Sequence, residues 1–300
     1  MILGRDYFTF QKGDTRLRLC YSTWSMQKPS VDEMIHNLAA IGFDSIELTV
    51  IPGWSTELDA MDATERKRIR RLLDDNNLAL PAIAGHRPLL AADPEVHAEN
   101  WRRLTGAIDL CVDWAGADGP PILDTTCGGK NTVPWADQVD LLVDRLGQLC
   151  DYAARRGVII GIEPHVSDIL ENPQKTIELL KLVNRQNLKV TFDISHFNVQ
   201  GISIEESVST LAPVSCFTHI KDERGVVPDF EFLIPGEGVF DYARYLRAMR
   251  MAGWTGDIGV EISLMVQRRP NYDPWAAAQQ SYDVVNRAFK EVGVTRPSGR

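Results

Sequence analysis

The sequence is poor in the features that mark membrane-spanning and secreted chains. It contains no run of about 18 or more apolar residues, the length a membrane-spanning helix requires. The first residues, MILGRDYFTFQKGDT, have neither the apolar core nor the small-residue cleavage site of a signal peptide. We therefore expect a cytoplasmic protein with no membrane partner.

Cysteines are few, and none are arranged as Cys-x-x-Cys. Five widely spaced cysteines argue against both a disulfide framework and a thiolate zinc site. Buried small side chains in a reducing compartment explain them better. Any chemistry of this chain is therefore expected to use oxygen and imidazole groups. The cysteines are Cys20, Cys111, Cys127, Cys150 and Cys216.

Basic residues are also in the minority, with 32 Lys and Arg against 41 Asp and Glu and a net charge of −9. A uniformly acidic surface repels phosphate backbones, so we expect no nucleic-acid partner. The sequence has no G-x-G-x-x-G or G-x-S-x-G motif, and Gly128-Gly129-Lys130 lacks the spacing of a phosphate loop. Hydride transfer with a bound nucleotide is therefore not expected.

Short apolar runs and amphipathic stretches alternate along the 300 residues, which is the pattern of repeated βα units. Eight such units without a linker favour a closed barrel over a doubly wound sheet, which usually has about six strands. We predict an α/β fold with a single (β/α)8 TIM barrel over residues 17–293, an N-terminal extension 1–16 and a C-terminal tail 294–300. The expected strands are 17–23, 44–50, 78–84, 120–124, 157–163, 188–193, 215–220 and 257–262.

Helix starts carry recognisable capping signals between these strands. Each signal supplies a side-chain oxygen for the unpaired N–H groups of a first helical turn. The long stretch 221–239 between the seventh strand and its helix is expected to contribute to the site, as long βα loops of barrels do. The signals are Ser30-x-x-Glu33, Asp62-x-x-Glu65, Ser203-x-x-Glu206, Asn172-Pro173 and Asp273-Pro274.

The last four predicted strands each end in a chemically active side chain: Glu163, Asp193, His219 and Glu261. Each alone has a structural explanation, such as an ion pair, a helix cap or a hydrogen-bonded core histidine. Together at one barrel mouth, three carboxylates would repel one another without a cation. This oxygen-rich set with one nitrogen suits one divalent ion, with Mn²⁺ favoured and Mg²⁺, Co²⁺ or Zn²⁺ as alternatives.

Further histidines and aromatic residues lie next to these strand ends. His165 follows Glu163 by two residues, so both side chains point the same way, and a neutral imidazole there is a candidate general base or acid. His196 follows Asp193 by three residues and is a candidate for binding a substrate hydroxyl; either histidine can also be structural. Weaker substrate-binding candidates on the opposite wall, which can equally serve packing, are Glu47, His86 and Trp24.

The stretches IGFDSIEL, IEPH, FDISH, THIKD and PGEGVFDYARYLRAMRMAGWTGDIGVEIS resemble the xylose isomerase-like barrels. That superfamily includes sugar isomerases, epimerases, inosose dehydratases and endonuclease IV, and the similarity spans about residues 17–292. The resemblance implies that Glu163, Asp193, His219 and Glu261 are metal ligands. It also implies that Glu163 and Glu261 act as acid and base, and that His196 contacts a substrate oxygen.

Two features depart from the epimerase pattern. The epimerases carry an arginine soon after the seventh-strand histidine, and Arg224 matches that position only approximately. The Glu163-Pro164-His165 motif is similar to the catalytic subunits of bacterial C-glycoside deglycosidases, which eliminate an aglycone from a 3-oxo-glycoside with a histidine base. An endonuclease IV-like phosphodiesterase would need more ligands and a basic face, so it is disfavoured.

These observations lead us to expect a metal-dependent enzyme that removes a proton next to the ketone of a sugar or keto-sugar. Returning the proton elsewhere gives isomerisation or epimerisation, with Glu163 or Glu261 as base; expelling a group gives a lyase reaction, with His165 as base. A non-catalytic scaffold would be expected to have lost ligands. We expect a small-molecule sugar or glycoside as partner and a homo-oligomer, and the resemblance to the deglycosidases adds a smaller second subunit as an option.

Overall fold

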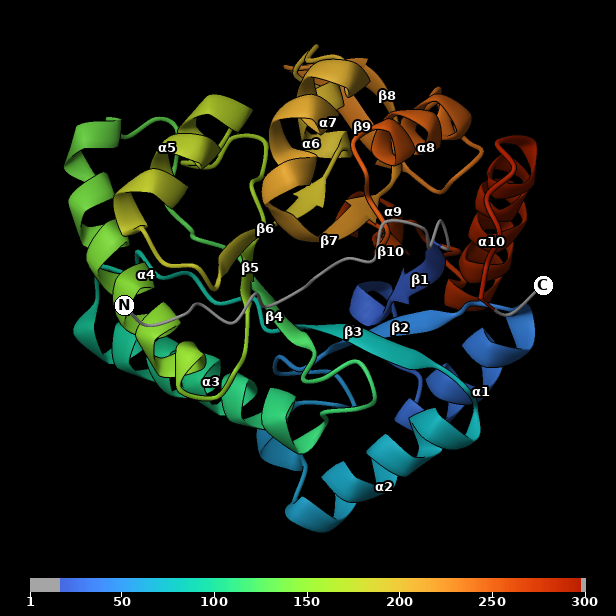
Figure 1. Ribbon diagram of the computed structural model, residues 1–300, viewed down its shortest axis with the longest axis horizontal. Helices are drawn as coiled ribbons and strands as arrows, with labels where there is room; N and C mark the ends of the chain where they lie inside the picture. The colour runs from blue at the N-terminus through green and yellow to red at the C-terminus, as the bar shows by residue number, and fades with distance from the viewer. Residues whose placement is uncertain (1–16, 298–300) are drawn as a thin grey trace, which may run out of the picture.

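The structure, a computed structural model, describes residues 17–297. Eight parallel strands close into a barrel in the order β1-β10-β7-β6-β5-β4-β3-β2 (Figure 1), which confirms the predicted (β/α)8 fold. The predicted extension 1–16 and residues 298–300 of the predicted tail lie outside the described residues. The barrel strands are β1 (Arg18–Ser22), β2 (Ser45–Thr49), β3 (Ala79–Ala84), β4 (Ile122–Thr125), β5 (Ile160–Ile162), β6 (Leu188–Asp193), β7 (Ser215–Ile220) and β10 (Asp257–Val260).

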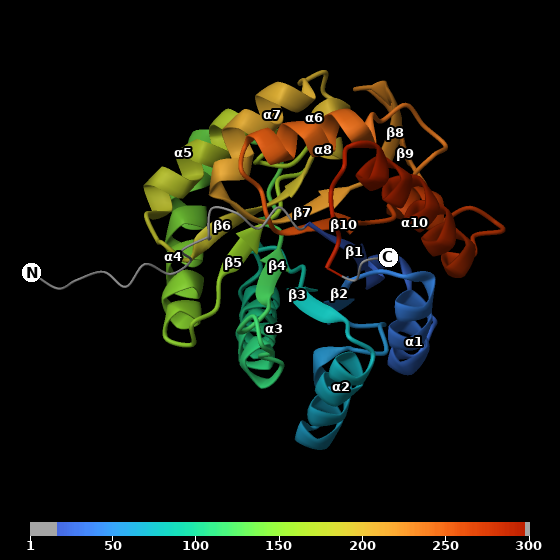
Figure 2. The ribbon, with the colours of Figure 1, turned by 45° about the vertical axis from the view of Figure 1, so that its right-hand side comes forward.

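Helices surround the barrel on its outside (Figures 1 and 2). Every predicted helix start that carries a capping signal is capped by the expected side chain, including Ser30, whose capping box with Glu33 is reciprocal. Asp62 caps its helix, but Glu65 pairs with Arg68 instead of reaching back. The helices are α1 (Val31–Ile41), α2 (Ala63–Asp75), α3 (Pro94–Asp113), α4 (Val139–Ala154), α5 (Pro173–Val183), α6 (Ser195–Asn198), α7 (Ile204–Leu211), α8 (Tyr242–Met251), α9 (Leu264–Gln267) and α10 (Pro274–Glu291).

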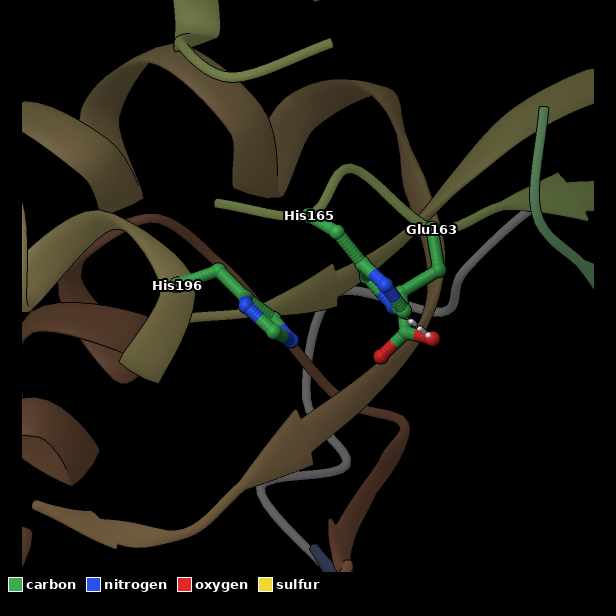
Figure 3. A group of neighbouring side chains, drawn as sticks. All are labelled: Glu163, His165 and His196. Carbon is green, nitrogen blue, oxygen red and sulfur yellow. Dashed lines mark hydrogen bonds and ion pairs between the residues drawn. The ribbon is translucent and has the colours of Figure 1, made fainter. Parts of the chain in front are cut away.

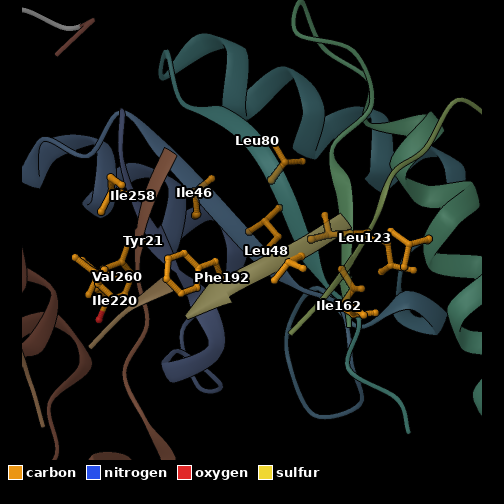
Figure 4. Packing of buried hydrophobic residues seen from close by; sticks show 14 of the residues in the cluster. Tyr21, Ile46, Leu48, Leu80, Leu123, Ile162, Phe192, Ile220, Ile258 and Val260 are labelled. Carbon is orange, nitrogen blue, oxygen red and sulfur yellow. The ribbon is translucent and has the colours of Figure 1, made fainter. Parts of the chain in front are cut away.

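Apolar strand residues form the core that fixes the barrel (Figure 4). Leu48, Ile162 and Phe192 are fully buried in one large cluster that also includes residues of the surrounding helices. A second small cluster contains only strand residues, Cys20, Ala82, Ile122 and Phe217, which places it inside the barrel. The Phe217 ring lies 5.3 Å from the ring of His219. An apolar layer within the barrel therefore supports the polar residues at its mouth.

The stretch 221–239 is not only a loop. It contains an antiparallel hairpin of β8 (Asp222–Val226) and β9 (Asp229–Leu233) that the sequence analysis did not predict, because polar residues and Pro228 interrupt the strand pattern. The Asp222 carboxylate accepts hydrogen bonds from the backbone N–H groups of Gly236 and Gly238. A Cβ at Gly238 would lie 2.3 Å from Asp222 Oδ1, so this tight approach requires glycine.

Strand register brings the ends of the last strands to one level. Asp193 pairs with His219, and His219 in turn pairs with Gly259, two residues before Glu261. Glu163 lies directly after β5, where its backbone N–H bonds to Thr125 of β4. The carboxyl ends of these strands therefore meet at one rim. Among the described residues, no helix is both long enough and apolar enough to cross a membrane.

Candidate functional site

A cavity of about 350 Å³ opens at the carboxyl ends of the barrel strands. The residues that line it follow seven of the eight barrel strands or lie on the β8–β9 hairpin: Trp24, His86, Thr126, Glu163, His165, Asp168, His196, Lys221, Phe232, Glu261, Ser263 and Leu264. A larger groove of about 540 Å³ lies between α7 and α8, but no histidine and no buried carboxylate lines it. The mouth cavity is therefore the candidate site.

The four predicted strand-end residues converge beneath this cavity. Glu163, Asp193, His219 and Glu261 are all buried, and each offers one ligand atom that lies within 4.8 Å of the other three. His219 Nδ1 lies 3.0 Å from Glu163 Oε1 and 4.0 Å from Glu261 Oε1. The structure thus brings together residues that are up to 98 positions apart in the sequence, from 163 to 261.

His219 is held between two glutamates. Its Nδ1 hydrogen-bonds Glu163 Oε1, and its Nε2 lies 3.0 Å from Glu47 Oε2 on the other side. Burial alone would lower the pKa of His219, but the charges of Glu47 and Glu261 and the hydrogen bond to Glu163 raise it well above its usual value. Glu47, predicted to bind substrate, does not line the cavity and instead fixes the orientation of the His219 ring.

Lys221 is a site residue that the sequence analysis missed. Its ammonium contacts Asp193 Oδ2 and lies 2.5 Å from Glu261 Oε2, and the residue is only 2% exposed. Burial works to lower the pKa of Lys221, but the charges of Asp193 and Glu261 outweigh it and raise the pKa. The same contact lowers the pKa of Asp193 to about 2 against the effect of burial. Lys221 follows His219 by two residues, a spacing that could have revealed it.

Asp124, at the end of β4, is a second missed residue. Both of its carboxylate oxygens are buried without a hydrogen-bond partner, as are Glu47 Oε1 and His86 Nδ1 nearby. Burial, followed by the charges of Glu163 and Glu47, raises the pKa of Asp124 well above its usual value. Asp124 closes the predicted strand 120–124, so the rule applied to the last four strands could have found it. Buried acceptors without partners are uncommon, and they mark this part of the barrel as a place where a ligand can bind.

His165 and His196 form a stacked pair on one wall of the cavity, with ring centroids 4.3 Å apart (Figure 3). His165 Nε2 lies 2.7 Å from Glu163 Oε2. Burial would lower the pKa of His165, but the Glu163 charge and this hydrogen bond raise it. In return, His165 and His219 hold the pKa of Glu163 well below its usual value against the effect of burial. The protonation state of His165 therefore depends on that of Glu163, and the reverse.

His196 is the neutral member of the stacked pair. The Val166 N–H donates to His196 Nδ1, which leaves the ring proton on Nε2, and Nε2 lies 3.6 Å from Asp193 Oδ2. Burial and the neighbouring His165 lower the pKa of His196 to about 3. A neutral ring with an N–H inside the cavity is a hydrogen-bond donor for a substrate oxygen.

Aromatic rings border the same cavity. Trp24 lines it and stacks on Trp54 with ring centroids 5.2 Å apart. The rings of Trp24 and His86 meet edge to face, also with centroids 5.2 Å apart. Burial lowers the pKa of His86 to about 4, so this imidazole is neutral. Arg224 lies apart on the hairpin, exposed, where it pairs with Glu231 and donates to the Glu237 carbonyl. It is the one predicted site residue among those described that the structure does not bring to this site.

The donor set fits a divalent cation. Three carboxylates and one imidazole lie close enough for one ion to reach an atom of each at about 2.0–2.2 Å. Next to this group, Glu47 Oε1 and both oxygens of Asp124 are buried without a hydrogen-bond partner. Oxygen donors with one nitrogen are the set that Mn²⁺, Mg²⁺, Co²⁺ and Zn²⁺ accept.

Comparisons with known proteins agree with this fold. The family profile described as "Xylose isomerase-like TIM barrel" matches residues 35–285. The chain is 21% identical over 261 residues to the 3-dehydroshikimate dehydratase of Bacillus anthracis, covering 79% of this chain and 90% of that protein. It is 23% identical over 266 residues to the fructoselysine 3-epimerase of Shigella flexneri, covering 83% and 91%.

A solved structure described as the IOLI protein with a binding zinc atom superposes with a TM-score of 0.73 at 21% identity, covering 91% of this chain and 99% of that one. The two relatives named above are enzymes, a dehydratase and an epimerase, in agreement with the predicted enzyme class. Because the profile spans most of the chain and eight parallel strands close the barrel, the chain belongs to the xylose isomerase-like TIM barrel family.

Proposed function

We propose that this protein is a divalent-metal-dependent enzyme that isomerises or epimerises a sugar or keto-sugar. It removes a proton from the carbon next to the carbonyl and returns it to another carbon or to the other face. The observation that carries this proposal is the buried convergence of Glu163, Asp193, His219 and Glu261 directly under the mouth cavity. The epimerase among the relatives supports the same reaction type.

The four converging residues would hold the cation, with Mn²⁺ as the first candidate and Mg²⁺, Co²⁺ and Zn²⁺ as alternatives. When bound, the ion would supply Lewis-acid stabilisation of the negative charge that develops on the substrate oxygen. Glu47 supports this arrangement because its carboxylate fixes the ring of His219 from the side away from Glu163. The zinc atom in the description of the IOLI structure supports a divalent ion in this fold.

Glu163 and Glu261 are the acid and base of the proposed reaction. Both line the cavity, from β5 and β10. His165 and His219 hold the pKa of Glu163 low against the effect of burial, and burial raises the pKa of Glu261 in spite of Lys221. A cation held by both carboxylates would keep both ionised, so the base is Glu163 or Glu261.

The other cavity residues bind and orient the substrate. The N–H of His196 donates to a substrate hydroxyl, and neutral His86 offers a second polar contact from the opposite wall. The faces of Trp24 and Phe232 border the space that a sugar ring would occupy. A cavity of about 350 Å³ fits a small molecule of this class.

A lyase reaction is the alternative, and the position of His165 favours it. This imidazole lines the cavity 2.7 Å from Glu163, where it can accept the proton next to the carbonyl while a group leaves the neighbouring carbon. The leaving group would be water, as in an inosose dehydratase, or the aglycone of a 3-oxo-C-glycoside. The dehydratase among the relatives supports this second outcome.

Proton NMR in D₂O tests the proposal with the Mn²⁺-loaded protein and a panel of ketoses, inososes and 3-oxo-glycosides, with products read after chelation of the metal. The proposal predicts deuterium next to the carbonyl together with a new ketose or aldose. Loss of water or release of an aglycone would establish the lyase alternative. No exchange with any member of the panel would contradict both.

The partners and the location of the protein remain predictions. The cavity size supports a small-molecule sugar or glycoside as the binding partner. A homo-oligomer, a smaller second subunit and a cytoplasmic location are proposals that rest on the sequence alone.

A further inference from the structure

A lysine ammonium stands among the four residues that would hold the cation. Lys221 Nζ contacts Asp193 Oδ2 and lies 2.5 Å from Glu261 Oε2, so it forms ion pairs with two of the three carboxylates among these four residues. Its side chain is 3% exposed and reaches the site from the end of β7, two residues after His219. The positive charge of Lys221 therefore pairs with two carboxylates of the group that would hold a metal ion.

A divalent cation and this ammonium cannot both stay on Asp193 and Glu261. Two positive charges about 4 Å apart at an effective dielectric constant of about 20 repel by several kcal/mol. Asp193 and Glu261, which hold Nζ, are two of the three carboxylates that a cation between the four residues would need. Binding of the cation must then move the ammonium away from the two carboxylates.

The cavity offers the ammonium a second position. Lys221 already lines the cavity, and its Nζ lies 5.8 Å from the centre of the Phe232 ring on the cavity wall. The four-carbon stem of lysine allows Nζ to swing by rotation of its side chain while the backbone of β7 stays fixed. An ammonium facing the cavity is a hydrogen-bond donor for a carbonyl or hydroxyl oxygen of a sugar.

We infer that Lys221 is a built-in counter-ion that exchanges with the divalent cation: it balances Asp193 and Glu261 in the metal-free protein, and metal binding delivers its ammonium to the cavity. The delivery to a sugar oxygen rests on the proposed function, but the exchange at the two carboxylates does not.

Zinc affinity tests the exchange. Zn²⁺ titrations by calorimetry would compare the wild type with Lys221→Met, Lys221→Arg and Lys181→Met, the last being an exposed lysine on α5 that matches the charge loss. Because the variant lacks the competing charge, we expect Lys221→Met to bind Zn²⁺ about tenfold tighter or more. Lys221→Arg and Lys181→Met should stay within about threefold of the wild type. Equal or weaker binding by Lys221→Met would overturn the inference.

If Lys221→Met fails to fold, a measurement on the wild type still tests the exchange. Brief acetylation with acetic anhydride, followed by peptide mass spectrometry, reports how accessible Lys221 is. Exchange predicts that Zn²⁺ increases acetylation of Lys221 several-fold while Lys181 is unaffected. Unchanged or reduced labelling of Lys221 in zinc-loaded protein would contradict the exchange.

The outcomes also separate this inference from the proposed function. Exchange without turnover of any sugar in the NMR panel would leave the role of Lys221 intact and remove the proposed reaction. Absence of Zn²⁺ binding by all four proteins would overturn both the exchange and the metal dependence. Turnover with metal but with no change in affinity on Lys221→Met would overturn only the exchange.

Discussion

The two ends of the barrel both bury carboxylates, but they balance them differently. At the amino ends of the strands, Asp257 accepts from Arg18 Nε at 3.0 Å and Nη2 at 2.8 Å, and Asp44 accepts from Arg296 Nε at 2.7 Å. At the carboxyl ends, Asp124 has no hydrogen-bond partner on either oxygen. The arginine-paired end is the structural end, whereas the mouth is the end with groups left for a ligand.

The two ends differ in which positively charged side chains pair with the buried carboxylates. An arginine stays charged and holds its carboxylate in a fixed two-pronged contact, which suits a permanent link such as Arg18–Asp257. The mouth uses His219 and Lys221 instead, whose charge or position can change. Functional ends of barrels differ from structural ends in this way because chemistry needs groups that can gain, lose or release a partner.

The largest expected effect is at the mouth, with His165→Ala. We expect the variant to keep its metal content, because His165 is not one of the four converging residues. Turnover should fall at least tenfold because Glu163 loses its 2.7 Å partner, and by about 10²–10⁴-fold if His165 is itself the base. Steady-state kinetics on the substrate found by NMR, together with metal analysis, measures both quantities.

His97→Ala is the matched control for that variant, since His97 lies on α3 away from the cavity. Kinetics of His165→Ala that match those of His97→Ala would remove His165 from the mechanism and weaken the lyase alternative.

At the structural end, Arg296→Ala should destabilise the fold. The change leaves Asp44 buried without its arginine and removes the bonds of Arg296 to Asn286 and the Gly42 carbonyl. Breaking a buried pair by removing one partner costs about 3–5 kcal/mol. Chemical denaturation measures the loss. Arg247→Ala, which removes an exposed ion pair with Glu291, should cost less than about 1 kcal/mol. Equal losses in the two variants would contradict the contrast between buried and exposed pairs.

The smallest effect concerns the hairpin beside the mouth. Burial raises the pKa of Glu223 to about 8, and one of its oxygens has no partner. The protonated form is therefore favoured in the folded state, so its contribution to stability is present below the usual glutamate pKa and is lost as the pH rises toward 8. Between pH 5 and pH 8.5, the free energy of unfolding of Glu223→Gln should therefore fall less than that of the wild type.

Thermal unfolding at the two pH values measures that difference. Glu95→Gln, a change at an exposed position on α3, should follow the wild type. Parallel pH profiles for wild type and Glu223→Gln would show that Glu223 is ionised in the folded protein.

Most of the fold follows from the sequence because local signals agree with one another. The predicted strands 188–193 and 215–220 match β6 and β7 residue for residue, since a turn or a helix cap bounds each apolar run. The other barrel strands differ from prediction at their ends by up to three residues, because hydrogen-bond partners decide where a strand stops. The β8–β9 hairpin was missed because polar residues and Pro228 interrupt the strand pattern there.

Part of the candidate site could likewise be predicted from the sequence, and part could not. Glu163, Asp193, His219 and Glu261 could be predicted because each ends a strand, and parallel strands bring their ends together. The contact between Lys221 and Glu261 could not, since it depends on the conformation of a flexible side chain at the end of β7. The role of Glu47 as the partner of His219 likewise depends on the closed barrel, in which side chains from the unpaired strands β2 and β7 meet.

Metal content of Glu163→Gln tests the central claim most directly. Wild type and variant would be loaded with Mn²⁺, passed through a desalting column and analysed by elemental mass spectrometry, with Glu206→Gln on the surface of α7 as control. The four-residue site predicts one ion per chain in the wild type and the control, and loss of both metal and activity in Glu163→Gln. Wild-type metal content in Glu163→Gln would contradict the assignment of this cluster as the metal centre.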